Sequence, residues 1–101
     1  MPSTTIDLVA YDFEQITVGA AAVGPTAAKI EGSGNPARRI LITTETNDIR
    51  YRLDGTDPSA TVGHKVVAGT AFEVTGPSDI RRLKMIRVSA DATINITYER
   101  E

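Results

Sequence analysis

Few side chains in this 101-residue sequence are of the types that carry out catalysis or bind metals. It contains no cysteine, which excludes a thiol nucleophile, a thiolate metal site and a disulfide framework. The single histidine, His64, needs converging carboxylates before it can hold a metal, so we expect a surface or interface role for it. No Gly-x-Ser-x-Gly motif is present. We therefore expect no catalytic site, no metal site and no cofactor.

Asp54 and Asp57 are the closest pair of carboxylates in an irregular segment of the sequence, Asp-Gly-Thr-Asp-Pro. A calcium-binding loop needs a third and a terminal acidic ligand, which this spacing lacks. Aspartates in such segments accept hydrogen bonds from backbone N–H groups, glycine adopts positive φ, and proline directs the chain out of the turn. The segment therefore predicts a turn that both aspartates cap, rather than a calcium site.

Arginine pairs are the most distinctive charged feature of the chain. They suit an interface because a guanidinium binds a carboxylate through two parallel hydrogen bonds. One alternative is a solvated strand face whose charges discourage edge pairing. Nucleic-acid binding is a third alternative, weakened because only Tyr51 lies among the arginines and it is expected to face the core. We take six arginines as candidate contacts with another subunit: Arg38, Arg39, Arg50, Arg52, Arg81 and Arg82.

The composition is that of one small domain, since 101 residues leave little room for two. Hydrophobic residues make up 41% and aromatic residues 5%, so the core must be built from small and β-branched side chains. The net charge of −2 does not mark a nucleic-acid binder. No apolar run approaches the length of a membrane span. Residues 1–5 lack the basic start and apolar stretch of a signal peptide, so we expect a soluble protein made in the cytoplasm.

Strict alternation of apolar and polar residues is the clearest strand signal. In the segment 38–46 it places Ile40 and Ile42 on one face, and in the segment 92–99 it places Ile96 and its apolar neighbours at alternate positions. Further strands are expected, from their β-forming residues, at 13–18, 26–31, 49–53, 64–68, 70–75 and 85–90.

The dipeptide Asn47-Asp48 is of the type that closes a two-residue hairpin. We therefore expect the strand 38–46 to pair antiparallel with the strand 49–53. In the second strand Tyr51 then points to the core, while Arg50 and Arg52 point outward.

Two segments near the end of the chain are less regular. The strand 85–90 is expected to turn Ile86 and Val88 inward. Before it, residues 80–83 fit either a single helical turn capped by Ser78 or the start of the strand.

Turn signals recur roughly every ten residues and divide the chain into about eight short strands, which is the pattern of a β-sandwich or jelly roll. No segment shows a helical period. We therefore expect an all-β, single-domain antiparallel β-sandwich, or a jelly-roll-like fold, at residues 13–101. Residues 1–12 are expected to form an N-terminal arm that orders on a neighbouring subunit.

The segment Ile49–Gly63 reads Ile-Arg-Tyr-Arg-Leu-Asp-Gly-Thr-Asp-Pro-Ser-Ala-Thr-Val-Gly and resembles a pattern found in small structural proteins of tailed bacteriophages. The resemblance extends upstream to Arg39–Ile42 and downstream to Leu83–Arg87 and Ala92–Tyr98. The turn within Tyr51–Pro58 is also similar to a turn in accessory β-sandwich modules of chitin-degrading enzymes. That second likeness is local, and shared turn chemistry accounts for it.

The phage resemblance implies a virion protein made in the host cytoplasm, above all a capsid decoration protein that binds the assembled head and cements it. The expected partners are the major capsid protein or neighbouring copies of the chain in a homo-oligomer, with no membrane and no specific nucleic acid. One alternative is a tail or fibre-associated accessory protein. Another is a module that binds host-surface carbohydrate and uses Tyr11, Phe13 or Tyr98 as its aromatic platform.

Overall fold

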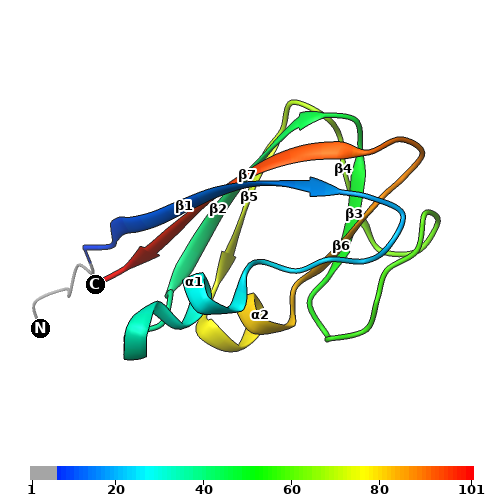
Figure 1. The fold of residues 1–101 in the computed structure, drawn as a ribbon. Helices are drawn as coiled ribbons and strands as arrows, with labels where there is room; N and C mark the ends of the chain where they lie inside the picture. The colour runs from blue at the N-terminus through cyan, green and yellow to red at the C-terminus, as the bar shows by residue number, and fades with distance from the viewer. Residues whose placement is uncertain (1–6) are drawn as a thin grey trace, which may run out of the picture.

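The computed structural model of the chain describes residues 7–101. Seven strands form two antiparallel sheets, with two short helices at one end, so the predicted all-β sandwich is confirmed (Figure 1). The elements in chain order are β1 (Val9–Val18), α1 (Ala27–Glu31), a 3-10 turn (Gly32–Gly34), β2 (Arg39–Thr46), β3 (Ile49–Arg52), β4 (His64–Val66), β5 (Ala71–Thr75), α2 (Pro77–Arg82), β6 (Lys84–Arg87) and β7 (Ala92–Arg100).

The chain crosses from one sheet to the other where the sequence predicts a hairpin. One sheet has the strand order β1-β7-β2-β5 and the other β4-β3-β6. Asn47 adopts a positive φ of 62°, but β2 pairs with β5 and β7, whereas β3 pairs with β4 and β6. The predicted β2–β3 hairpin is therefore wrong. Alternation indicates which side chains are buried, but it does not specify the paired strand, because both sheets face one core.

The connection between β4 and β5 crosses between the sheets in the same way. Gly69, at a φ of 86°, donates its N–H to the Thr44 carbonyl at 2.7 Å. The backbone N–H and the hydroxyl of Thr44 both donate to the Thr70 carbonyl at 3.0 Å. These bonds satisfy the backbone groups at the point where the chain leaves one sheet for the other. The two predicted strands at 64–68 and 70–75 lie in different sheets, as β4 and β5.

The predicted apolar faces of β2 and β7 line the core and are fully buried. The alternation predicted for β6 is wrong, because Met85 is fully buried whereas Ile86 and Val88 are only half-buried. Met85 also exchanges backbone hydrogen bonds with Val23 on the open side of β6, at 2.8 and 2.9 Å. That pairing holds β6 in the register that turns Met85 inward.

The segment 26–31, predicted as a strand, is the helix α1 instead. The helix follows Thr26 and ends at Gly32, which adopts a left-handed φ of 53°. Ile30 is its one buried residue. A helix of five residues is too short to show a helical period in the sequence or to be stable by itself, so burial of Ile30 in the core must stabilise it.

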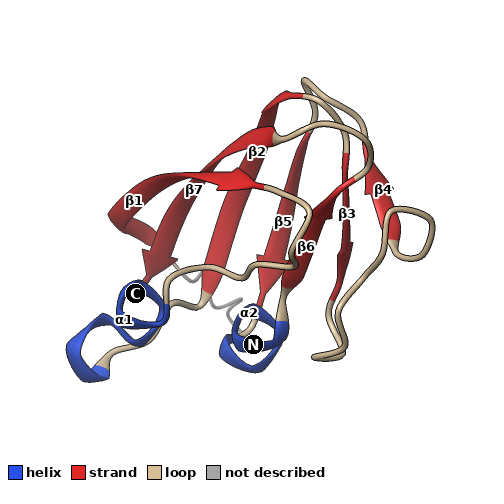
Figure 2. Cartoon of the chain, turned by 45° about the vertical axis from the view of Figure 1, so that its right-hand side comes forward, coloured by secondary structure: helices blue, strands red, loops and turns tan. Residues whose placement is uncertain are grey.

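The ambiguous segment before β6 is also helical. α2 begins with Pro77, which is favoured at the first helical position because its missing N–H would have no partner there. The cap position is Gly76, with a φ of 97°, rather than Ser78. Ile80 is fully buried. Figure 2 shows α1 and α2 at the same end of the strands.

β1 starts earlier than predicted. Val9 already pairs with β7, so residues 9–12 belong to the sheet and not to an N-terminal arm. The pairing register shifts between Ala10 and Asp12, and this bulge interrupts the alternation that would have indicated a strand. Residues 1–6 of the predicted arm lie outside the described residues.

A pair of substitutions in β7 tests the assignment of the core. Ile96→Ala removes a fully buried side chain and should lower the free energy of unfolding by about 2–5 kcal/mol. Thr97→Ala, on the opposite face of the same strand, should change it by less than about 0.5 kcal/mol. Urea titration of both variants measures the difference, and equal losses would contradict the assigned faces.

Candidate interaction surface

The six arginines predicted to contact another subunit come from β2, β3, α2 and the residue before β2, and most of them pair within the chain. Arg39 donates two hydrogen bonds to the Glu99 carboxylate, at 2.7 and 3.1 Å. Arg81 of α2 donates two to Glu31 at the end of α1, at 2.8 and 2.9 Å. The bonds from Arg81 lower the pKa of Glu31. These carboxylates are of the type expected from a second subunit, but they come from the chain itself.

Arg50 lies on the face of β3 away from the core, since it alternates with the buried Ile49 and with Tyr51, and from there it holds the loop of residues 54–63 in place. Its guanidinium donates to the carbonyls of Ala60 at 3.1 Å and Gly63 at 2.9 Å. Carbonyls of an irregular loop need such donors because no neighbouring strand supplies them. Arg50 therefore stabilises the loop within Ile49–Gly63, the segment that carries the phage resemblance.

Asp54 caps the turn after β3, as predicted. Its carboxylate accepts the N–H of Thr56 at 3.2 Å and two bonds from Arg52, at 3.1 and 2.5 Å. The hydrogen bond from Arg52 is the main reason that the pKa of Asp54 is lowered. Gly55 adopts the expected positive φ, at 82°. Asp57 makes no comparable bond within the described part of the chain.

Arg38 and Arg82 complete the set. Arg38 is exposed and donates to Glu101 at 3.3 Å. Arg82 forms no hydrogen bond or ion pair with any described residue, and it lines an open cleft of about 610 Å³ together with His64 and Val62. Arg82 is thus the candidate arginine whose guanidinium is left to bind a partner. The interface role of all six stays a prediction.

Tyr51 fills the gap between the edge strands β4 and β5. Its ring stacks on Phe72 with centroids 4.5 Å apart and planes at 10°. His64 lies 5.2 Å from the same ring on the solvent side. Both Tyr51 and Phe72 pack against the core cluster, so the predicted anchoring of Tyr51 is confirmed. Because Phe72 and the core occupy the inner side of the Tyr51 ring, His64 packs on its outer side and lies at the surface.

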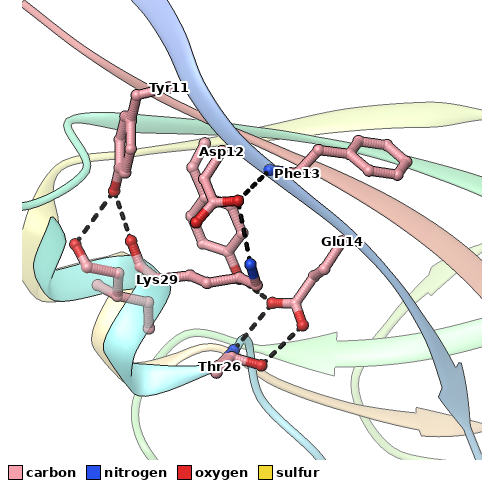
Figure 3. A network of polar contacts seen from close by, with 8 residues as sticks. Tyr11, Asp12, Phe13, Glu14, Thr26 and Lys29 are labelled. Carbon is pink, nitrogen blue, oxygen red and sulfur yellow. Dashed lines mark hydrogen bonds and ion pairs between the residues drawn. The ribbon is translucent and has the colours of Figure 1, made fainter.

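A polar network joins β1, β7 and α1 (Figure 3). Glu14 accepts hydrogen bonds from the buried hydroxyl of Tyr98, from the Thr26 N–H at 3.1 Å and from the Thr26 hydroxyl at 2.7 Å. Beside it, Lys29 donates to Asp12 at 3.0 Å. Apart from Tyr98, no residue of this network was predicted as functional. The sequence does carry one signal for it, since Glu14 shares the inner face of β1 with Ile16 and Val18.

The network shifts the pKa values of its members. Desolvation opposes ionisation of Glu14, but the bonds from Tyr98 and Thr26 outweigh it and hold the pKa of this carboxyl below its usual 4.5. Burial, and then the hydrogen bond to Glu14, raise the pKa of Tyr98. Burial also raises the pKa of Tyr11, whose hydroxyl donates to the Lys29 carbonyl at 2.6 Å.

The aromatic residues expected as carbohydrate platforms differ in exposure. Tyr98 is fully buried. Tyr11 is half-buried beneath Arg100, whose guanidinium carbon lies 4.0 Å from the ring centroid. Only Phe13 is well exposed, at 55%. Of these three residues, only Phe13 therefore presents its ring to solvent.

The outward face of the four-stranded sheet, opposite the core, carries this ring. Phe13 of β1 lies opposite Thr97 of β7, which lies opposite Leu41 of β2. Leu41 is 37% exposed. The same face is otherwise formed by these residues: Gln15, Thr17, Arg39, Thr43, Glu45, Ala71, Glu73, Thr75, Thr93, Asn95 and Glu99. The outward face thus carries an apolar pair, Phe13 and Leu41, which Thr97 separates, and the charged side chains of Arg39 and Glu73 border Leu41.

Within residues 7–101, no three histidine, aspartate or glutamate side chains lie close enough to hold a metal ion. No helix in the same residues is long and apolar enough to cross a membrane. Comparison of the chain with protein-family models, curated proteins and solved structures found no match. An assignment of function must therefore rest on the outward face and on the resemblance of residues 49–63.

The polar network predicts how stability depends on pH. Since the pKa of Glu14 is lower in the folded chain, its ionised form stabilises the fold above the unfolded pKa, and this contribution is lost as the pH falls through the folded value. Glu14→Gln should therefore reduce the fall in melting temperature between about pH 5 and about pH 3. Thr26→Ala, which removes one donor, should have a smaller effect. Identical profiles for Glu14→Gln and the parent would contradict the role of this carboxylate.

Two glycine substitutions test how tightly the loop of residues 54–63 packs. Gly55 and Gly63 both have positive φ, but a Cβ at Gly63 would lie 3.1 Å from Pro58 Cβ and from the Tyr51 carbonyl, whereas Gly55 faces open space. Gly55→Ala should cost about 1–2 kcal/mol of backbone strain, and Gly63→Ala at least about 1 kcal/mol more. Chemical denaturation measures both, and a smaller loss for Gly63→Ala would contradict the packing.

Proposed function

We propose that this chain is a structural protein of a bacteriophage particle, a decoration protein that binds the assembled head and stabilises it. The resemblance of residues 49–63 and the strands around them to small structural proteins of tailed phages supports the phage assignment. The observation that carries the binding role is the outward face of the four-stranded sheet, where Phe13 and Leu41 are exposed on either side of Thr97.

The outward face has the properties of a contact surface. Phe13 and Leu41 lie on the same face, one on each side of β7, and their exposed apolar surface favours a partner that buries it, at about 25 cal/mol per Å² of apolar area. The threonine and amide side chains on this face offer hydrogen bonds, and Arg39 and Glu99 there already neutralise one another as an ion pair. Asn95, for example, already bonds to Gln15 at 3.0 Å and to Glu45 at 2.9 Å, so these side chains are held in position before binding.

The proposed mechanism is cementing at the boundary between capsid subunits. A protein that binds the assembled shell but not the free subunits stabilises the shell by mass action, with no chemical step. Arg82, without a partner in the described chain, is suited to pair with a capsid carboxylate through its guanidinium. Most of the other candidate arginines form hydrogen bonds within the chain. These bonds stabilise the fold that presents the binding surface.

A co-sedimentation assay with heads assembled without this protein tests the proposal. The purified chain should pellet with heads and not with unassembled capsid subunits. Leu41→Glu, which places a charge in the apolar pair, should weaken pelleting by at least about tenfold. Val67→Glu is the matched control, because Val67 is 54% exposed but lies away from the outward face, and it should bind as the parent does.

Three outcomes would contradict parts of this proposal. Equal pelleting of Leu41→Glu and Val67→Glu would remove the outward face from the interface. Binding to purified tails rather than heads would replace the decoration role with a tail accessory role. Binding to neither particle would overturn the virion assignment. Thermal melts of both variants show that any loss is not due to unfolding.

A further inference from the structure

β1 has a long free edge. It lies at one end of the order β1-β7-β2-β5, and within the described part of the chain it pairs with β7 alone over its ten residues. The edge strands β4 and β5 have only three and five residues. The open side of β6 is bonded to Val23 through Met85 and to Gly19 through Arg87. Among residues 7–101, β1 therefore offers the longest run of backbone without a neighbouring strand.

The backbone groups that face away from β7 can be identified. The N–H of Phe13 donates to the side chain of its neighbour Asp12 at 2.8 Å, so it points to the open edge and not to β7. In an antiparallel strand, the N–H and C=O of one residue point to the same side, and this side alternates along the strand. Gln15 and Thr17 therefore present their N–H and C=O groups to the open edge. Neither forms a backbone bond there with a described residue.

The usual protection of an edge strand is weak in β1. Natural sheets guard such edges with lysine, proline, inward charges or a bulge. β1 contains no lysine or proline, and its bulge lies at one end, between Ala10 and Asp12. Both of its carboxylates are already bonded within the chain, Asp12 to Lys29 and Glu14 to Tyr98. The backbone groups of Gln15 and Thr17 and the carbonyl of Phe13 are thus left open for pairing.

We propose that a second copy of this chain adds its own β1 antiparallel to this edge, so that two four-stranded sheets join into one continuous sheet. A two-fold axis at Gln15 sets Gln15 opposite Gln15 of the second copy and Phe13 opposite Thr17. It also sets Glu14 opposite Ile16, and Asp12 opposite Val18, so no like charges meet. A second copy thereby satisfies the open backbone groups with a complementary register that the sequence of β1 itself provides.

The pairing would place the outward faces of both copies on the same side of the joined sheet. A particle surface would then meet two apolar pairs, each built from Phe13 and Leu41, instead of one. Linking two binding faces increases the strength of attachment without any new contact, provided both can engage at once. The pairing itself is independent of the head-binding role, because it depends only on the edge of β1.

Sedimentation equilibrium of the isolated chain tests the pairing. Gln15→Pro removes the N–H that faces the open edge, and proline is tolerated on edge strands in that orientation. Gln15→Ala is the matched control, since it removes the same side chain but keeps the N–H. The parent and Gln15→Ala should sediment as dimers and Gln15→Pro as a monomer. A monomeric parent, or a dimeric Gln15→Pro, would overturn the proposal.

A cross-linking experiment gives a second readout that does not require a proline variant to fold. Directly opposed residues in a hydrogen-bonded antiparallel pair have Cα atoms about 5.5 Å apart, which suits a disulfide. The chain has no cysteine, so Gln15→Cys introduces a single thiol. Under mild oxidation it should form a covalent dimer with greater than about tenfold preference over Thr75→Cys, an exposed position on β5. Equal cross-linking of the two variants would overturn the pairing, whether or not the protein binds heads.

Discussion

The buried hydroxyl of Tyr98 is the group on which much of this structure depends. A phenol with no exposed surface needs a hydrogen-bond partner, because an unsatisfied polar group in the core is costly. Glu14 supplies that partner from β1 and, through the same carboxylate, binds both donors of Thr26 ahead of α1. One interaction therefore positions the edge strand against the centre of the sheet and attaches the helix that closes the core.

The intramolecular pairing of the arginines changes what the surface can do. Arg39, Arg52 and Arg81 each bind a carboxylate of the chain through two bonds, and Arg50 binds loop carbonyls. Such contacts join β2 to β7, join α2 to α1, and hold the loop of residues 54–63 onto β3. The surface that stays open is instead the outward face around Phe13 and Leu41, together with the edge of β1. Attachment through these regions relies on burial and backbone hydrogen bonds, which salt screens less than it screens surface charge.

Some of this arrangement was predictable because it follows from local alternation. The inward faces of β2 and β7 and the turn capped by Asp54 are set by residues close together in the sequence. The candidate site was less predictable. The sequence indicates that Leu41 faces away from the core. Only the pairing of β1 with β7 shows that Phe13 lies on the same face as Leu41. The carboxylates that bind Arg39 and Arg81 lie 60 and 50 residues away in sequence, and no short-range pattern signals such pairs.

The sequence by itself determined that the chain is a small all-β domain, because strand alternation and turn residues act over a few positions. It also determined the shape of the turn after β3. Only the tertiary structure decided which strands pair, because side chains facing a common core are buried equally well from either sheet. Contacts with the core likewise decided that residues 27–31 and 77–82 are helical, since segments this short have no stable helix of their own. Residues distant in sequence had to meet before Tyr98 and Glu14 could form the bond between β7 and β1, the last and first strands of the chain.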